Sequence, residues 1–178
     1  MFVRWSAAIA AAILLSSPVL LQGARAADKL TDPQIAHIAY TAGVIDINAA
    51  KQAQKKAKNK DVKAFADDML RDHEAVNKQA LALVKKLNVT PEDNATSQAL
   101  TKVAAAKQAE LSKLSGAAFD RAYVENEVAY HKTVNGALKD TLIPNSQNAE
   151  LKSLLQTGLS LFTAHQQHAE HLSMSLAK

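Results

Sequence analysis

The stretch DVKAFADDMLRDHEAVNKQALALVKKL, residues 61–87, decides the fold, because its core-forming positions recur at intervals of three and four residues. This spacing aligns those side chains along one face of an α-helix. Asp61 is the expected N-cap of the helix, since its carboxylate can accept hydrogen bonds from the free N–H groups of the first turn. The face comprises Val62, Phe65, Met69, His73, Val76, Ala80, Leu83 and Leu87. The sequence therefore predicts one long amphipathic helix whose buried face includes a histidine.

Further helical patterns lie on both sides of this stretch. Asp32 and Pro33 predict the start of a helix that continues to about residue 57, where Asn59 ends it. A shorter helix is expected around residues 100–114, and a long one over residues 117–142. Pro144 is expected to break that helix and Ser146 to cap the last one, because proline disfavours a helix interior. No segment shows the two-residue alternation of a half-buried strand.

The connections predict the topology. Short turns at Asn59 and Pro144 make two antiparallel helical hairpins, and residues 88–116 are long enough to cross between them. Two hairpins joined by a helical crossover form an all-α, ferritin-like four-helix bundle. A plain up-and-down bundle is the alternative that these loop lengths leave open.

Residues 1–26 are interpreted separately from the bundle. Arg4 precedes an apolar run, and Ala24-Arg25-Ala26 follows it as a small-x-small cleavage pattern, which is typical of a secretory signal peptide. We therefore expect cleavage near Ala26, a single domain over residues 27–178, a periplasmic or secreted location, and no integral membrane span after cleavage. The alternative is a retained N-terminal anchor.

Composition excludes several classes of function. The chain has no cysteine, which excludes thiol catalysis and thiolate metal sites. Its 21 basic residues exceed its 17 acidic ones by only four, and Arg4 and Arg25 leave with the signal peptide. This modest charge predicts no nucleic-acid partner. After cleavage only Arg71 and Arg121 remain to bind phosphate in a bidentate manner.

Ionisable residues occupy positions that should be buried. His73, Glu127 and His165 fall on the apolar faces of the long helices, and polar groups in such a core cost about 1–3 kcal/mol each unless they are satisfied. Three interpretations follow: a hydrogen-bonded polar core, a metal held by carboxylates and imidazoles from several helices, and a pocket for a proton or small ligand. Further candidates flank these faces, namely Asp46, Asp72, His131 and His168.

Counting from the turns estimates the depth of each candidate. Asp46 and His73 each lie about a dozen residues from Asn59, which places them at one level of the first hairpin. In the second hairpin, Glu127 and His165 differ by about one helical turn when counted from Pro144. His131 and His165 differ by about 10 Å on the same count, too far to share an ion unless the turn is asymmetric.

Two local motifs bear on metal binding. Glu127 and His131 are four residues apart, a spacing that suits either a two-ligand clip for a divalent ion or a helix-stabilising pair. In HQQHAEH, His165 and His168 can share a face, whereas His171 points away. A neighbouring pair of these histidines could capture copper, nickel or zinc at the surface.

Three segments carry a family resemblance: VKAFADDMLRDHEAVNKQ, LSGAAFDRAYVENEVAYH and LFTAHQQHAE. They resemble a secreted bacterial family of unknown function in the ferritin-like superfamily, whose members are often labelled outer-membrane or periplasmic proteins. The resemblance covers nearly the whole mature chain and implies a ferritin-like bundle in the periplasm. It implies no established activity. The family usually has a glutamate where this chain has Asp46.

Motifs for catalysis are missing from the sequence. No acidic residue has a histidine three positions later, so the Glu-x-x-His pairs of di-iron bundles are absent. Gly-x-Ser-x-Gly and His-Glu-x-x-His are absent too. We therefore expect a non-enzymatic bundle that binds a divalent metal (zinc, copper or iron) or a small ligand. The alternative is a structural or stress-related module that contacts envelope proteins or forms a homo-oligomer. The predicted metal ligands are Asp46, Asp72, His73, Glu127, His131 and His165, with His168 as a weaker one.

Overall fold

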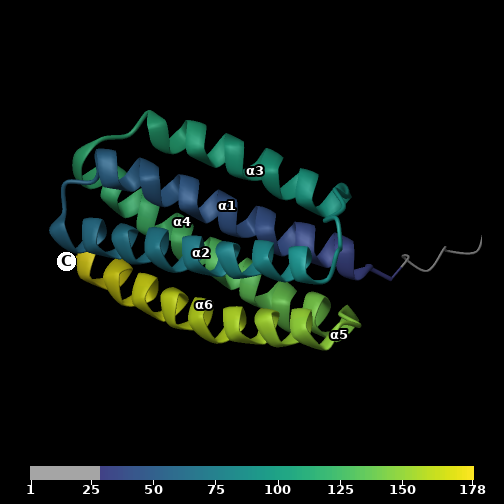
Figure 1. The fold of residues 1–178 in the computed structure, drawn as a ribbon. Coiled ribbons are helices and arrows are strands. Elements are labelled where there is room, and N and C mark those ends of the chain that lie inside the picture. The colour runs from purple at the N-terminus through teal and green to yellow at the C-terminus, as the bar shows by residue number, and fades with distance from the viewer. Residues whose placement is uncertain (1–28) are drawn as a thin grey trace, which may run out of the picture.

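The computed structural model describes residues 29–178, which form helices, the loops between them and short segments at either end (Figure 1). The helices are α1 (Asp32–Lys56), α2 (Lys60–Lys86), α3 (Ala95–Ser112), α4 (Gly116–Ala137), the π-helical η1 (Leu138–Leu142), α5 (Ile143–Asn145) and α6 (Ala149–Leu176). The prediction of an all-α helical bundle is confirmed, and the assignment to the ferritin-like superfamily stays a prediction. The expected signal peptide, residues 1–26, lies outside the described residues.

Four long helices pack side by side (Figure 1). α1 and α2 form one antiparallel hairpin, and α4 and α6 form the other. α3 connects the two hairpins and lies along α1 on the outside of the bundle. Within residues 29–178, none of the helices combines the length and the hydropathy that a membrane crossing requires.

Three predicted helix caps are wrong by one or two residues. Asn59 caps α2, because its side-chain oxygen accepts hydrogen bonds from the backbone N–H groups of Asp61 (2.7 Å) and Val62 (3.2 Å). Asp61 lies inside the first turn, where its negative charge interacts favourably with the positive end of the helix dipole. Thr31 caps α1 in place of Asp32.

Asp32 instead stabilises the turn of the α4–α6 hairpin. Its carboxylate accepts hydrogen bonds from the backbone N–H groups of Gln147 (2.8 Å) and Asn148 (2.7 Å). Asn148 in turn caps α6 by accepting from the N–H groups of Glu150 and Leu151. The prediction that Ser146 caps this helix is therefore wrong, although the Ser146 hydroxyl donates a hydrogen bond to Asp32 (3.2 Å).

Pro144 does not end the helical path, contrary to the prediction. In η1 the N–H of Ile143 bonds to the carbonyl of Leu138, five residues back. This wider turn shifts the hydrogen-bond register just before the proline, whose ring would otherwise clash with the preceding turn. The chain stays helical to Asn145 and reverses only at residues 146–148. The turn of the second hairpin therefore lies several residues later than predicted.

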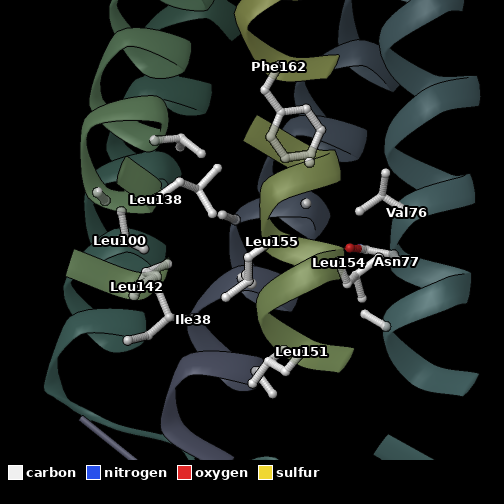
Figure 2. Close-up of a pocket in the computed structure, with 18 of the residues that line it drawn as sticks. Ile38, Val76, Asn77, Leu100, Leu138, Leu142, Leu151, Leu154, Leu155 and Phe162 are labelled. Carbon is white, nitrogen blue, oxygen red and sulfur yellow. The ribbon is translucent and has the colours of Figure 1, made fainter. Parts of the chain in front are cut away.

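The apolar core is divided into two clusters. One includes Phe65, Phe119 and Tyr123. The other includes Ile35, Leu142 and Leu155, and it encloses an apolar cavity of about 70 Å³ (Figure 2). The interior of the bundle also contains buried ionisable side chains. These side chains form the candidate site.

Candidate metal centre

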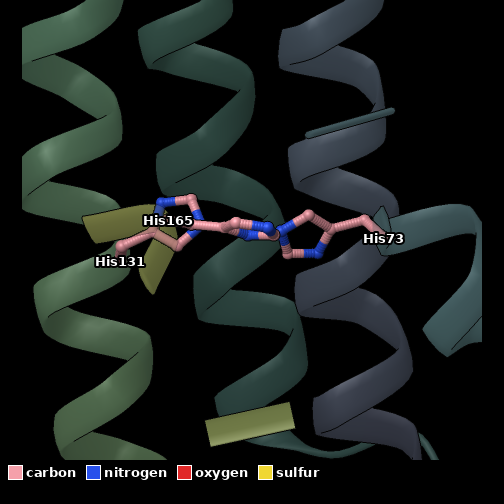
Figure 3. A group of neighbouring side chains, drawn as sticks. All are labelled: His73, His131 and His165. Carbon is pink, nitrogen blue, oxygen red and sulfur yellow. The ribbon is translucent and has the colours of Figure 1, made fainter. Parts of the chain in front are cut away.

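Three imidazoles from three helices meet inside the bundle. His73 comes from α2, His131 from α4 and His165 from α6 (Figure 3). Their ring centroids are 5.4–5.6 Å apart, and one nitrogen of each ring lies within 4.8 Å of the other two. All three residues are buried. The arrangement is a compact triad of nitrogen donors.

The predicted separation of His131 and His165 is wrong. Counting from Pro144 gives about 10 Å, whereas the ring centroids are 5.5 Å apart. The error comes from the turn, because the chain reverses at residues 146–148. The two histidines lie at nearly equal distances along the chain from that point, so they share one level.

The first hairpin adds a carboxylate to the triad. Asp46 of α1 is buried, and its Oδ2 lies 3.5 Å from His73 Nε2 and 3.6 Å from His131 Nε2. The equal depth predicted for Asp46 and His73 therefore brings the two together. Asp46 also belongs to a second donor group with Glu127 and His131, whose ligand atoms lie within 4.8 Å of one another. His131 is common to both groups.

Outer contacts orient two of the imidazoles. His131 Nδ1 lies 3.0 Å from the backbone carbonyl of Glu127, to which it donates when that nitrogen carries the proton. His165 Nε2 lies 3.0 Å from Asp72 Oδ2 and donates to it in the same way. These tautomers leave the lone pairs on His131 Nε2 and His165 Nδ1, which are free to bind a cation. Such outer partners are characteristic of metal-binding histidines.

Asp72 itself is held by Arg71, which the sequence analysis did not include among the candidate site residues. Arg71 donates from Nε to Asp72 Oδ1 (2.8 Å) and from Nη2 to Asp72 Oδ2 (3.1 Å). Burial alone would raise the pKa of Asp72, but its hydrogen bonds with Arg71 and His165 lower it overall. Asp72 thus contacts His165 from outside the two donor groups. It is a positioning residue in this arrangement.

A polar layer inside the bundle consists of the buried side chains of Asp46, His73, Glu127, His131 and His165. Several atoms of this layer have no hydrogen-bond partner among the described residues. Leaving such an atom buried and unpaired costs about 1–3 kcal/mol. The unpartnered atoms are both carboxylate oxygens of Asp46, both ring nitrogens of His73, Glu127 Oε2, His131 Nε2 and His165 Nδ1. This concentration of unpartnered polar atoms at one level is the strongest feature of the site.

Burial drives these groups toward their neutral forms. It raises the pKa of Asp46 to about 7, and it raises the pKa of Glu127 well above its ordinary value with help from the neighbouring Asp46. It lowers the pKa of His73 to about 2 and that of His131 to about 4. The imidazoles are therefore unprotonated at neutral pH, as metal coordination requires.

Phe162 lies against this layer, whereas His168 lies outside it. Phe162 stacks on His73 with a centroid distance of 4.4 Å and an interplanar angle of 9°. Its place on the apolar face of α6, three residues before His165, is the signal that could have identified it. His168 is exposed and packs edge-on against Phe65, with a centroid distance of 5.1 Å, so it stands apart from both donor groups.

Comparisons with known proteins identify a family and a fold. No curated protein matches the chain. A solved structure described as "CopM in the Cu(II)-bound form" is similar in fold, with a TM-score of 0.63 and 15% sequence identity. The similarity covers 83% of this chain and 98% of that one. Residues 18–172 match the family described as "Domain of unknown function (DUF4142)", and the chain belongs to that family.

Proposed function

We propose that this protein is a metal-binding helical bundle that holds one divalent transition-metal ion. The proposed ligands are His73, His131 and His165 with the carboxylate of Asp46. The observation that carries the proposal is the set of unpartnered, buried lone pairs that these four side chains direct into one layer. A bound cation would satisfy one lone pair on each of these four side chains.

The spacing of the donors supports an ion of this size. Two ligand atoms that each lie about 2.1 Å from a tetrahedral ion are about 3.4 Å apart. The Asp46 carboxylate approaches His73 and His131 at 3.5 and 3.6 Å, close to that value. The imidazole nitrogens lie within 4.8 Å of one another, so they would need to approach by up to about 1.4 Å to bind one ion.

The donor types favour copper among the three metals expected from the sequence. Imidazole and carboxylate ligands suit zinc, copper and iron, and the affinity of such a site is greatest for Cu²⁺. The chain has no thiolate to favour Cu⁺. The similar structure CopM is described as Cu(II)-bound, which makes Cu²⁺ the first metal to test.

Charge balance supports a divalent ion. At neutral pH, burial keeps the imidazoles unprotonated and favours protons on Asp46 and Glu127. An ion with two positive charges can replace the two carboxyl protons without adding net charge to the interior. This exchange avoids the large penalty of burying an uncompensated charge.

The proposed function also includes a periplasmic location and a binding role without catalysis. Export to the periplasm rests on the pattern of residues 1–26, and a binding role without catalysis rests on the absence of nucleophile and di-iron motifs. The alternative is an envelope interaction module with a satisfied polar core. It has less support, because so many polar atoms of that core lack partners.

Metal titration of protein purified without a histidine tag tests the proposal. We expect one Cu²⁺ per chain by calorimetry and elemental analysis, and about 2.7 kcal/mol of added stability at a free concentration 100 times Kd. His168→Ala is the matched control, because this exposed histidine lies outside both donor groups. Absence of binding together with unchanged melting for copper, zinc and iron would reject the proposal.

A further inference from the structure

A cleft on the α1–α3–α4 side of the bundle reaches the polar layer. Its volume is about 370 Å³, and its walls are parts of these three helices. α3 is held to α1 by a hydrogen bond from Gln52 Nε2 to the carbonyl of Gln108 (3.1 Å). Exposed side chains at its rim include Val103 of α3 together with Ala129 and Thr133 of α4. The cleft is therefore open to solvent between α3 and α4.

The cleft ends at the two carboxyl groups of the centre. Asp46 and Glu127 both line it, and each is only 1% exposed. Apart from the proton that these two carboxyl groups can share, both oxygens of Asp46 and Oε2 of Glu127 have no hydrogen-bond partner among the described residues. None of His73, His131 and His165 belongs to the cleft lining. A cation that enters from this side therefore meets carboxylate oxygen before it meets imidazole.

The apolar cavity is unsuitable as a route for an ion. The apolar cavity beyond Phe162 is lined by aliphatic side chains, with Asn77 among the few polar groups (Figure 2). Phe162 also stacks on the ring of His73. Moving a divalent ion through hydrocarbon without oxygen or nitrogen ligands carries a very large desolvation penalty. The cleft instead offers polar side chains along its length, including Gln52, Asn126 and Tyr130.

We infer that the α1–α3–α4 cleft is the route by which a divalent cation reaches the histidine triad, with Glu127 and Asp46 as its first protein ligands. This inference rests on the proposed metal binding and concerns the rates at which the ion binds and leaves. Glu127 acts as a transfer ligand on the way in, and Asp46 remains bound because it also contacts His73 and His131. Narrowing the cleft should therefore slow association and dissociation equally, since the bound state itself is unchanged.

Substitution at the cleft rim tests the route. Ala129→Phe adds an aromatic ring at an exposed position of α4 that lines the cleft. Ala118→Phe is the matched control, because Ala118 is also exposed on α4 but does not line the cleft. Full-length proteins are mixed with Cu²⁺ by stopped flow, and free Cu²⁺ is followed with an indicator whose fluorescence it quenches. Equilibrium titration of the same proteins supplies Kd.

We expect Ala129→Phe to slow association about tenfold, with Kd unchanged and with Ala118→Phe behaving like the wild type. Val103→Phe narrows the same cleft from the α3 side, at a residue that is 69% exposed, and should give the same result. Wild-type association rates in both cleft variants would overturn the route while leaving metal binding intact. A wild-type protein that binds no Cu²⁺ would instead overturn the proposed function, and the route with it.

Discussion

The polar layer and the apolar cavity are two parts of one core, built by the same helices, and they differ in almost every physical respect. The layer holds buried carboxyl and imidazole groups whose lone pairs lack partners. The cavity has a volume of about 70 Å³, and it is bordered by side chains such as Leu155 and Val76, which cannot form hydrogen bonds. Phe162 lies between them, because its ring stacks on His73 and also lines the cavity.

The difference shows which defects of packing point to function. A small apolar void loses dispersion contacts, and its consequence is confined to stability. Unpaired buried donors and acceptors carry a greater penalty, and a cation can remove it. We therefore expect substitutions in the layer to change metal affinity, whereas substitutions at the cavity should change stability alone.

The largest effect is expected at His131, which is common to both donor groups. His131→Ala should weaken Cu²⁺ binding by about a thousandfold or more, since it removes a ligand and the contact that Asp46 makes with it. Calorimetric titration measures the loss. His168→Ala should bind as the wild type does, and equal affinities in the two variants would place the ion elsewhere.

The next effect belongs to the cavity. Leu155→Ala enlarges a void that already exists, and we expect a loss of about 3 kcal/mol in the free energy of unfolding. Urea denaturation of the metal-free protein measures it. Cu²⁺ affinity should stay at the wild-type value, and a parallel loss of affinity would show that the two regions are not independent.

A smaller effect is expected where a residue acts through another. Asp72→Asn weakens the partner of His165 Nε2 without removing a ligand, so Cu²⁺ affinity should fall about 10- to 100-fold. Asp68→Asn is the control, because Asp68 also accepts a hydrogen bond from Arg71 (2.6 Å) but makes no hydrogen bond with His165. Equal affinities in the two variants would remove the positioning role of Asp72.

The smallest effect, when it is counted per pH unit, is a gradual dependence of Cu²⁺ affinity on pH. Burial raises the pKa of Asp46 to about 7, so below that value the metal-free protein binds a proton that the ion must displace. The histidines do not oppose this trend between pH 7 and 5, because burial lowers the pKa of His73 to about 2 and that of His131 to about 4. Affinity should therefore fall by up to about tenfold per pH unit over that range, because the ion displaces one proton from Asp46. Titrations at constant ionic strength would contradict this if they gave a constant Kd.

Sequence periodicity anticipated the bundle and much of the layer, for a local reason. The three-and-four spacing around His73 specifies which face is buried, and the short turn at Asn59 sets the depth of Asp46 relative to it. Both features depend on nearby residues alone. The same count failed in the second hairpin, where η1 carries the helical path past Pro144.

Contacts between helices that are far apart in the sequence could not be predicted from helical spacing. The stacking of Phe162 on His73 and the contact of Asp72 with His165 depend on how α2 and α6 are rotated against each other. Helical spacing identifies a buried face without identifying its neighbour. Asp72 was therefore predicted as a metal ligand together with His73, although its side chain contacts His165 and Arg71.

X-ray absorption spectroscopy of the untagged, Cu²⁺-loaded protein tests the central claim most directly. We predict a first shell of nitrogen and oxygen donors with outer-shell scattering from three imidazoles, reduced in His131→Ala and unchanged in His168→Ala. Copper that shows no imidazole scattering, or the same spectrum in His131→Ala as in the wild type, would contradict a metal centre formed by His73, His131 and His165.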